Sequence, residues 1–303
     1  MTVQEALNQV SLSAANFGNA ETLADVLSDW IAFLGGRPGE IVLVDGGSSP
    51  ATHSVCFDLF QKGHIDKLQL IGPNHPDNNK NTCYLQEHAA GAIGSKPYIL
   101  FFKSDTLPYR NGDDDWLPRA LELLDRPDTF AIGGSFNMPV KHHDAPFPGW
   151  YFTQKCSLNF ALMKRSKFVE AMQEFAGPYI ASNFSGISPV PDDGKGSPRY
   201  LVEVAFEAYI KKHGVFALVK VEDESWTVFH TNAAGKRLVK VRQDYLARRN
   251  ITPYLNAGRV VAFHGGCYYG MKRRWIKELR VAFGASRFGP HWRAIKRLFA
   301  AGS

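Results

Sequence analysis

One apolar run, residues 98–102, constrains the fold of this chain more than any other stretch. Five consecutive apolar or aromatic residues are typical of a strand that is buried on both faces. The run ends abruptly at Lys103, Ser104 and Asp105, and Pro108 follows shortly after. Ligands of open α/β sheets bind just beyond the carboxyl ends of the strands. We therefore expect the Lys-Ser-Asp turn to lie at a binding site.

Strand and helix patterns alternate along most of the chain. Apolar and β-branched runs predict strands at residues 10–14, 41–44, 68–71, 130–135, 215–221 and 226–230. Helical patterns cover residues 20–34, 55–60, 84–94, 116–124, 160–175 and 201–213. Residues 141–151 and 180–199 are expected to be loops. This alternation predicts an α/β fold with a mostly parallel, twisted sheet flanked by helices.

The charge of the chain is unevenly distributed. Residues 232–303 hold sixteen Lys and Arg against two acids, which gives this region a net charge of +14. Because the whole chain has a net charge of +6, residues 1–231 have a net charge of −8. We therefore predict two parts, an α/β domain over 1–231 and a basic helical region over 232–303. An anionic partner suits this region, and a membrane surface, a nucleic acid and an acidic substrate are all candidates.

Two amphipathic helices are predicted within the basic region. Trp275 lies on the apolar face of the first helix and Trp292 on that of the second. Basic residues flank the apolar face of each helix. Such helices suit an anionic membrane interface. Packing of the same apolar faces on the body of the protein is the alternative.

Cysteine usage and the lack of targeting signals indicate a cytoplasmic protein. The four cysteines, Cys56, Cys83, Cys156 and Cys267, show no paired metal-ligand spacing. We expect reduced, buried thiols. The first residues contain no basic segment followed by an apolar run, so no signal peptide is expected. No stretch reaches the ~18 apolar residues of a membrane-spanning helix.

Four motifs along residues 9–232 carry a resemblance to a known family. The first is the strand at 10–16, and the second is the strand at 40–44 that runs into the Asp-Gly-Gly-Ser-Ser turn at 45–49. The third is 97–108, and the fourth is 201–206 with the later run 226–230. In this order and at this spacing the motifs resemble those of the GT-A glycosyltransferases of the family 2 type.

The resemblance implies a Rossmann-like GT-A domain that binds a nucleotide-diphosphate sugar. It implies donor-binding roles for Ala14, Asn16, Asp45, Gly46, Lys103, Ser104 and Asp105. It also implies that Asp105 and His230 hold a divalent metal, Mn²⁺ or Mg²⁺, and that Glu203 is the general base. The chain departs from the family at Lys103, which replaces the first acid of the metal motif. Its ammonium is a further candidate for neutralising phosphate.

Each of these residues also has a purely structural interpretation. Asp45 could hold an Asx-type turn, and Asp105 could cap the turn after its strand. Glu203 could be a solvated acid on a helix, and His230 could be a structural histidine. The carboxyl-end position of Asp45 favours a functional role, in which it accepts a hydrogen bond from the base or ribose.

The resemblance therefore implies a hexosyltransferase-like enzyme that moves a sugar to a hydroxyl acceptor with inversion. The basic region suggests a lipid-linked or polysaccharide acceptor and peripheral association with the inner face of the cytoplasmic membrane. A non-catalytic nucleotide-sugar-binding domain is the alternative that Lys103 suggests. A nucleic-acid binder is disfavoured because the core lacks a nucleic-acid motif. A sugar nucleotidyltransferase is disfavoured because its Gly-rich, Arg-containing N-terminal loop is missing.

Overall fold

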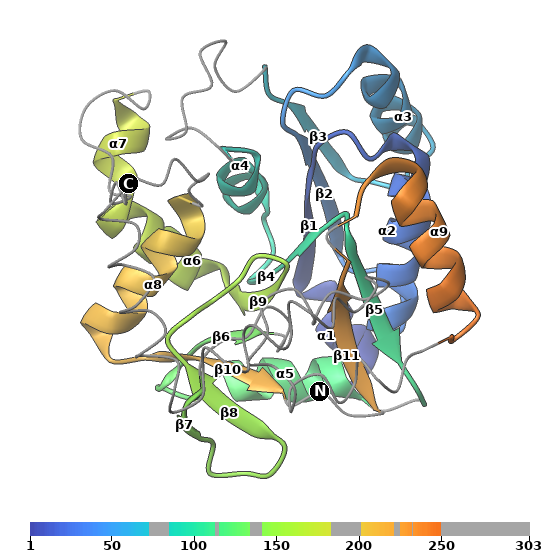
Figure 1. The fold of residues 1–303 in the computed structure, drawn as a ribbon. Coiled ribbons are helices and arrows are strands. Elements are labelled where there is room, and N and C mark those ends of the chain that lie inside the picture. Colours follow the sequence, from blue (N-terminus) through green and yellow to red (C-terminus); the bar gives the residue numbers. More distant parts are fainter. Residues whose placement is uncertain are drawn as a thin grey trace, which may run out of the picture.

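A computed structural model describes residues 1–72, 85–112, 115–133, 141–182, 201–220, 225–231 and 233–249 (Figure 1). The predicted helices centred on Trp275 and Trp292 lie outside these residues, as do Cys83, Cys267 and most of the expected loop at 180–199. Cys56 and Cys156 are buried free thiols, as predicted. Within the described ranges, no helix combines the length and the apolar character needed to cross a bilayer.

The described residues form a nine-stranded central sheet in the order β3-β2-β1-β4-β9-β6-β10-β8-β7. Its strands are β1 (Val10–Asn16), β2 (Glu40–Asp45), β3 (Lys67–Leu70), β4 (Tyr98–Lys103), β6 (Thr129–Gly133), β7 (Lys141–Asp144), β8 (Trp150–Thr153), β9 (Phe160–Lys164) and β10 (Phe216–Lys220). Strands β3, β2, β1 and β4 pair in parallel, as do β6 and β10. Only β9 and β8 run against the other strands of this sheet. The predicted mostly parallel α/β sheet is confirmed.

A second, two-stranded sheet stands beside the first. It pairs β5 (Thr106–Arg110) with β11 (Trp226–His230) in antiparallel register, with Thr106 opposite His230. The sequence predicted β11 but not β5, which begins directly after the Lys-Ser-Asp turn. This pairing brings the end of β11 back to the carboxyl end of β4.

Helices cover both faces of the central sheet (Figure 1). They are α1 (Val3–Asn8), α2 (Ala20–Leu34), α3 (Pro50–Gln61), α4 (Leu85–Ile93), α5 (Trp116–Leu124), α6 (Arg165–Phe175), α7 (Gly177–Ala181), α8 (Leu201–His213) and α9 (Gly235–Leu246). Buried residues of α1, α2, α3 and α5 pack on one face, and those of α4, α6, α7 and α8 pack on the other.

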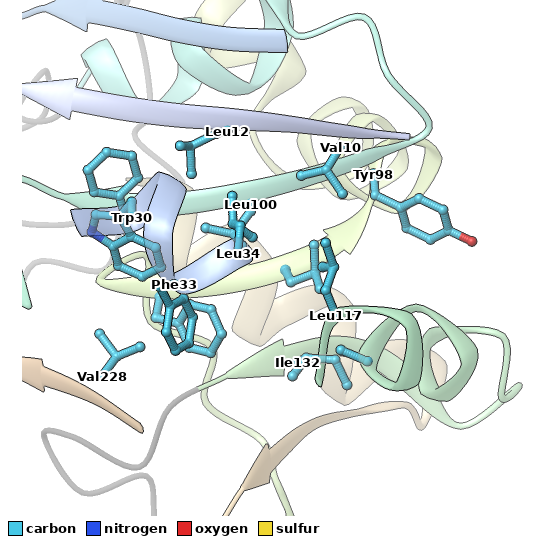
Figure 2. Packing of buried hydrophobic residues seen from close by; sticks show 14 of the residues in the cluster. Val10, Leu12, Trp30, Phe33, Leu34, Tyr98, Leu100, Leu117, Ile132 and Val228 are labelled. Atoms are coloured by element: carbon cyan, nitrogen blue, oxygen red, sulfur yellow. The ribbon is translucent and has the colours of Figure 1, made fainter. Parts of the chain in front are cut away.

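Strand β4 is buried on both faces, as its apolar run predicts. Leu100 and Phe102 belong to the cluster on the α2 side, whereas Ile99 and Phe101 belong to the cluster on the α4 side. Figure 2 shows part of the first cluster, which includes Trp30 of α2 and Leu100 of β4. The ring centroids of Trp30 and Phe102 are 4.8 Å apart. Because these large side chains are almost fully withdrawn from water, they anchor the strand whose end carries the site.

Two predictions about the middle of the chain are wrong. Residues 160–175 do not form one helix, because β9 occupies 160–164 as the antiparallel strand between β4 and β6, and α6 starts only at Arg165. A short apolar run fits a buried strand and a buried helix equally well. Residues 141–151 are not simply a loop, because β7 pairs with β8 at the sheet edge. All of β7 is exposed and polar, so it lacks the alternation of a half-buried strand.

The basic region begins with a helix that packs on the α/β body. On α9, Arg242 Nε donates to Asp29 Oδ2 of α2 at 2.8 Å, and its Nη1 donates to Asp25 Oδ2 at 3.1 Å. Leu238 and Val241 of the same helix are buried. The division of the chain at residue 232 stays a prediction.

Gly91 of α4 provides the first test of this packing. A Cβ at this position would lie 2.4 Å from Phe168 Cζ and 2.7 Å from Phe101 Cζ, and both rings are buried. We expect Gly91→Ala to lower the free energy of unfolding by about 1–2 kcal/mol, because overpacking outweighs the gain in helix propensity. Urea unfolding measures the change.

The matched control is Gly72→Ala, because no described atom would lie within 4 Å of a Cβ at Gly72. We expect this variant to unfold within about 0.5 kcal/mol of the parent protein. A Gly91→Ala protein as stable as the parent would show that the two rings move aside at no cost.

Candidate functional site

The predicted donor-binding residues end three neighbouring parallel strands. Asn16 ends β1 and is paired with Asp45, which ends β2, while Lys103 ends β4 opposite Ala15. The carboxyl ends of parallel strands meet at the same edge of a sheet, where ligands bind in open α/β folds. The structure therefore brings these three side chains to one edge, as the sequence predicts.

Asp45 is surrounded by donors from the protein itself, and its side chain is fully buried. Its Oδ1 accepts from the Gly47 and Ser48 backbone N–H groups at 3.1 and 2.8 Å and lies 3.1 Å from His53 Nε2. Its Oδ2 accepts from Asn16 Nδ2 at 2.8 Å and from Ser48 Oγ at 2.7 Å. The carboxylate therefore holds the turn after β2, the Asx-type role that the sequence left open.

The pKa of Asp45 reflects this environment. Burial acts to raise it, but the hydrogen bonds from Ser48, Asn16 and His53 outweigh burial and lower the pKa below its ordinary value. Sequence reasoning missed His53. Its position in the first turns of α3, eight residues after Asp45, was the available signal.

Ala14 and Gly46 lie within the packing around the site. Ala14 belongs to the core on the α2 side and is 2% exposed, so its side chain does not reach the edge. A Cβ on Gly46 would come within 2.8 Å of the Gln86 side chain of α4. The glycine thus makes room for a neighbouring side chain. Its implied donor-binding role stays a prediction.

The Lys-Ser-Asp turn is tied to two other elements. Ser104 Oγ accepts a hydrogen bond from Asn19 Nδ2 at 2.7 Å, just before α2. Lys103 Nζ forms an ion pair with Glu87 Oε1 of α4 at 2.9 Å. Glu87 is a second residue that sequence reasoning missed. Nothing in the local pattern of α4 distinguishes it from a solvated helix acid.

Glu87 has an unusual pKa for a carboxyl group. Burial raises it, the charge of Lys103 offsets part of this rise, and the charge of Glu203 adds to it, so that the pKa lies at about 7. Strongly shifted groups of this kind gather at functional sites. The influence of Glu203 also indicates that α4 and α8 present acids to the same region.

Asp105 and His230, which the sequence predicts as metal ligands, are in contact with each other. Asp105 Oδ2 lies 3.0 Å from His230 Nε2, across 125 residues of sequence. The Asp105 carbonyl oxygen accepts from the Thr231 backbone N–H at 3.0 Å and from Thr231 Oγ1 at 2.7 Å, which fixes the two segments together. His230 Nδ1 lies 3.3 Å from Asn159 Nδ2.

This pair is chemically suited to a metal that is shared with a phosphate ligand. Among the described residues, no group of three or more His, Cys, Asp or Glu side chains could hold a metal ion. A protein can hold Mg²⁺ through one or two carboxylates while water and substrate phosphates complete the shell. One carboxylate and one imidazole therefore fit such a cation only when a ligand supplies further oxygens.

Glu203 is fixed by the loop before β9. Its Oε1 accepts from Ser157 Oγ at 3.1 Å and from the Leu158 backbone N–H at 2.9 Å. The next residue of that loop, Asn159, contacts His230. A single three-residue segment thus links Glu203 to the Asp105–His230 pair, and Glu203 is no freely solvated acid.

The comparisons with known proteins assign no family to the chain. No protein-family model matches it, and no curated protein sequence matches it. Among solved structures, it is similar to the mannosyltransferase PcManGT from Pyrobaculum calidifontis in complex with GDP-Man and Mn²⁺. The identity is 15%, the match covers 97% of this chain and 80% of that chain, and the TM-score is 0.45. A likeness at this level decides neither family nor function.

Proposed function

We propose that this chain is a GT-A glycosyltransferase that transfers a sugar from a nucleotide-diphosphate donor to a hydroxyl acceptor. The observation that carries the proposal is the contact between Asp105 and His230 at the carboxyl edge of the sheet. It is supported by the loop at 157–159, which connects this pair to Glu203. The four sequence motifs within residues 9–232 suggest the donor class.

In this proposal Asp105 and His230 hold one Mn²⁺ or Mg²⁺ together with the donor diphosphate. When bound, the cation would offset the negative charge of the leaving nucleoside diphosphate. The two protein ligands are held by Thr231 on the Asp105 side and by Asn159 on the His230 side. The first contact fixes the backbone of Asp105, and the second is made to the imidazole ring of His230.

Glu203 is the proposed general base. It accepts the proton of the acceptor hydroxyl while the hydroxyl oxygen forms a bond to the anomeric carbon and the bond to the diphosphate oxygen breaks. Attack from the side opposite the leaving group inverts the anomeric centre. The hydrogen bonds from Ser157 and Leu158 to Oε1 orient the carboxylate for this step.

The acceptor in this proposal is lipid-linked or polysaccharide, at a cytoplasmic membrane surface. The support is the +14 balance of residues 232–303. Three basic residues of α9, Lys236, Arg237 and Lys240, are exposed. Attraction to an anionic leaflet is worth ~1 kcal/mol per basic residue close to the surface.

A non-catalytic nucleotide-sugar-binding domain is the second candidate. The observation that favours it is Lys103, which pairs with Glu87 at a position where the family carries an acid. Transfer or hydrolysis of a nucleotide sugar by the purified protein separates the two candidates. Binding without any turnover would support the second.

The proposal predicts a metal-dependent response to nucleoside diphosphates. In a thermal-shift panel of nucleoside diphosphates and their sugars, we expect at least one ligand to stabilise the protein by about 2.7 kcal/mol at 100 times its Kd. Mn²⁺ should increase that shift in the parent protein but not in Asp105→Asn, which loses the carboxylate beside His230.

Asp144→Asn is the matched control, because Asp144 is an exposed acid on the edge strand β7. It should respond to Mn²⁺ like the parent protein. If no nucleoside diphosphate stabilises the chain, the proposed function is wrong. If binding survives complete chelation unchanged, the donor-binding part stands and the metal part is wrong.

A further inference from the structure

The ion pair between Lys103 and Glu87 lies at the same edge of the sheet as the proposed donor site. Lys103 is the last residue of β4, two residues before Asp105. Its side chain is 19% exposed, whereas that of Glu87 is 2% exposed. The ammonium group therefore lies toward the surface of the site and the carboxylate lies behind it.

A second ion pair, between the first residues of β2 and β3, provides a useful comparison. Glu40, the first residue of β2, binds Lys67, and both of its oxygens accept hydrogen bonds. Glu87 differs, because its Oε2 is buried with no hydrogen-bond partner among the described residues. A buried carboxylate oxygen without a hydrogen bond lowers the stability of the folded protein. Because such oxygens are rare in native structures, this one calls for an explanation.

From this geometry we propose that Lys103 binds the diphosphate of the donor and that Glu87 is the positioning residue that holds its ammonium in place. The proposal rests on the proposed function and adds a second positive charge, besides the cation, to the diphosphate site. An ammonium has three N–H donors, so one lysine can bind a carboxylate and a phosphate oxygen together. Fixing the side chain beforehand removes the entropy cost of ordering it when the ligand binds.

The chemistry at the end of β4 supports this assignment. Lys103, Ser104 and Asp105 follow one another where a ligand of this fold would lie, and Ser104 is already held by Asn19. Lysine binds phosphate as a point charge. A stabilising role alone would not require the pair to lie at this edge.

Calorimetric titration with nucleoside diphosphates and the matching monophosphates tests the proposal. UDP and GDP are compared with UMP and GMP in the presence of Mn²⁺, using the parent protein, Lys103→Met and Glu87→Gln. We expect Lys103→Met to weaken diphosphate binding about 10- to 100-fold and monophosphate binding by less than about threefold. Glu87→Gln should weaken diphosphate binding about tenfold, because the ammonium is no longer fixed.

The pattern of losses distinguishes a positioning role from structural damage. A general distortion of the site would weaken both ligands alike, whereas the proposal predicts a loss confined to the diphosphate. Lys62→Met, which removes an exposed lysine paired with Asp58, is the matched control and should bind both ligands as the parent protein does. If Lys103→Met does not fold, the double variant Glu87→Gln with Lys103→Met removes both members of the ion pair and carries the same expectation.

Three results would contradict the proposal or the function on which it rests. Unchanged diphosphate affinity in Lys103→Met would overturn the role of Lys103. Equal or tighter diphosphate binding by Glu87→Gln would overturn the positioning role of Glu87. If the parent protein binds neither diphosphate in this experiment nor any other in the thermal-shift panel, the proposed function itself fails, which is distinct from a failure confined to the variants.

Discussion

Replacing Glu203 by Gln is expected to reduce kcat for sugar transfer by about 10²–10⁴-fold, the range attributed to a general base. Glutamine has the same shape, and its side-chain oxygen can still accept the hydrogen bonds that Ser157 and Leu158 donate to Oε1. The loop at 157–159 should therefore keep its place. What is lost is the ability to take a proton, so the KM for the donor should change by less than about threefold.

Glu207 provides the matched control for this experiment. It lies one turn further along α8, and burial raises its pKa, so it is an acid on the same helix that is partly withdrawn from water. We expect Glu207→Gln to keep kcat within about threefold of the parent value. Steady-state kinetics with radiolabelled donor measures both variants. Near-normal turnover by Glu203→Gln would remove Glu203 from the mechanism.

The parts of the fold that sequence predicts well are those with a strong local signal. The helical period of residues 20–34 and the apolar run at 98–102 each decide their own structure within a short window. Burial of β4 on both faces also follows from the run itself, since no polar position is left to face water. The carboxyl-end position of Asn16, Asp45 and Lys103 then follows from parallel pairing.

The parts that sequence missed depend on partners far away in the chain. β9 forms a strand because β4 and β6 offer it two edges, and its own residues fit a helix as well. β5 forms because β11, more than a hundred residues later, pairs with it. Neither partner can be read from the local pattern of hydrophobic residues.

The same limit applies to the charges of the site. Glu87 resembles any acid on a helix until Lys103 and the surrounding core bury it. The sequence predicts that Asp45 lies at the carboxyl edge of the sheet. It does not predict the hydrogen bonds to its carboxylate, because Asn16 and His53 come from other elements. Sequence thus predicts which residues reach the edge of the sheet, and tertiary contacts decide which of them face a ligand.

Glu40→Gln should destabilise the protein more than Gly91→Ala does. Burial would raise the pKa of Glu40, but the hydrogen bonds from Lys67, Ser11 and Ser95 outweigh it and lower the pKa from 4.5 to about 2. A shift of this size corresponds to about 3 kcal/mol of folding free energy at pH 7. We expect Glu40→Gln to lose about this amount in urea unfolding at pH 7, because the amide keeps the shape but not the charge.

The pH dependence of that loss distinguishes the charge from packing. Because the folded pKa lies below the unfolded one, the stabilisation is complete well above pH 4.5 and disappears as the pH falls toward 2. The difference between the parent protein and Glu40→Gln should therefore narrow by about 1 kcal/mol between pH 5 and pH 3.5. Glu122→Gln, at an exposed acid paired with Arg119, should stay within about 0.5 kcal/mol of the parent protein throughout. A difference for Glu40→Gln that is constant with pH would mean that the loss comes from the hydrogen bonds that the amide cannot accept from Ser11 and Ser95, and not from the charge of Glu40.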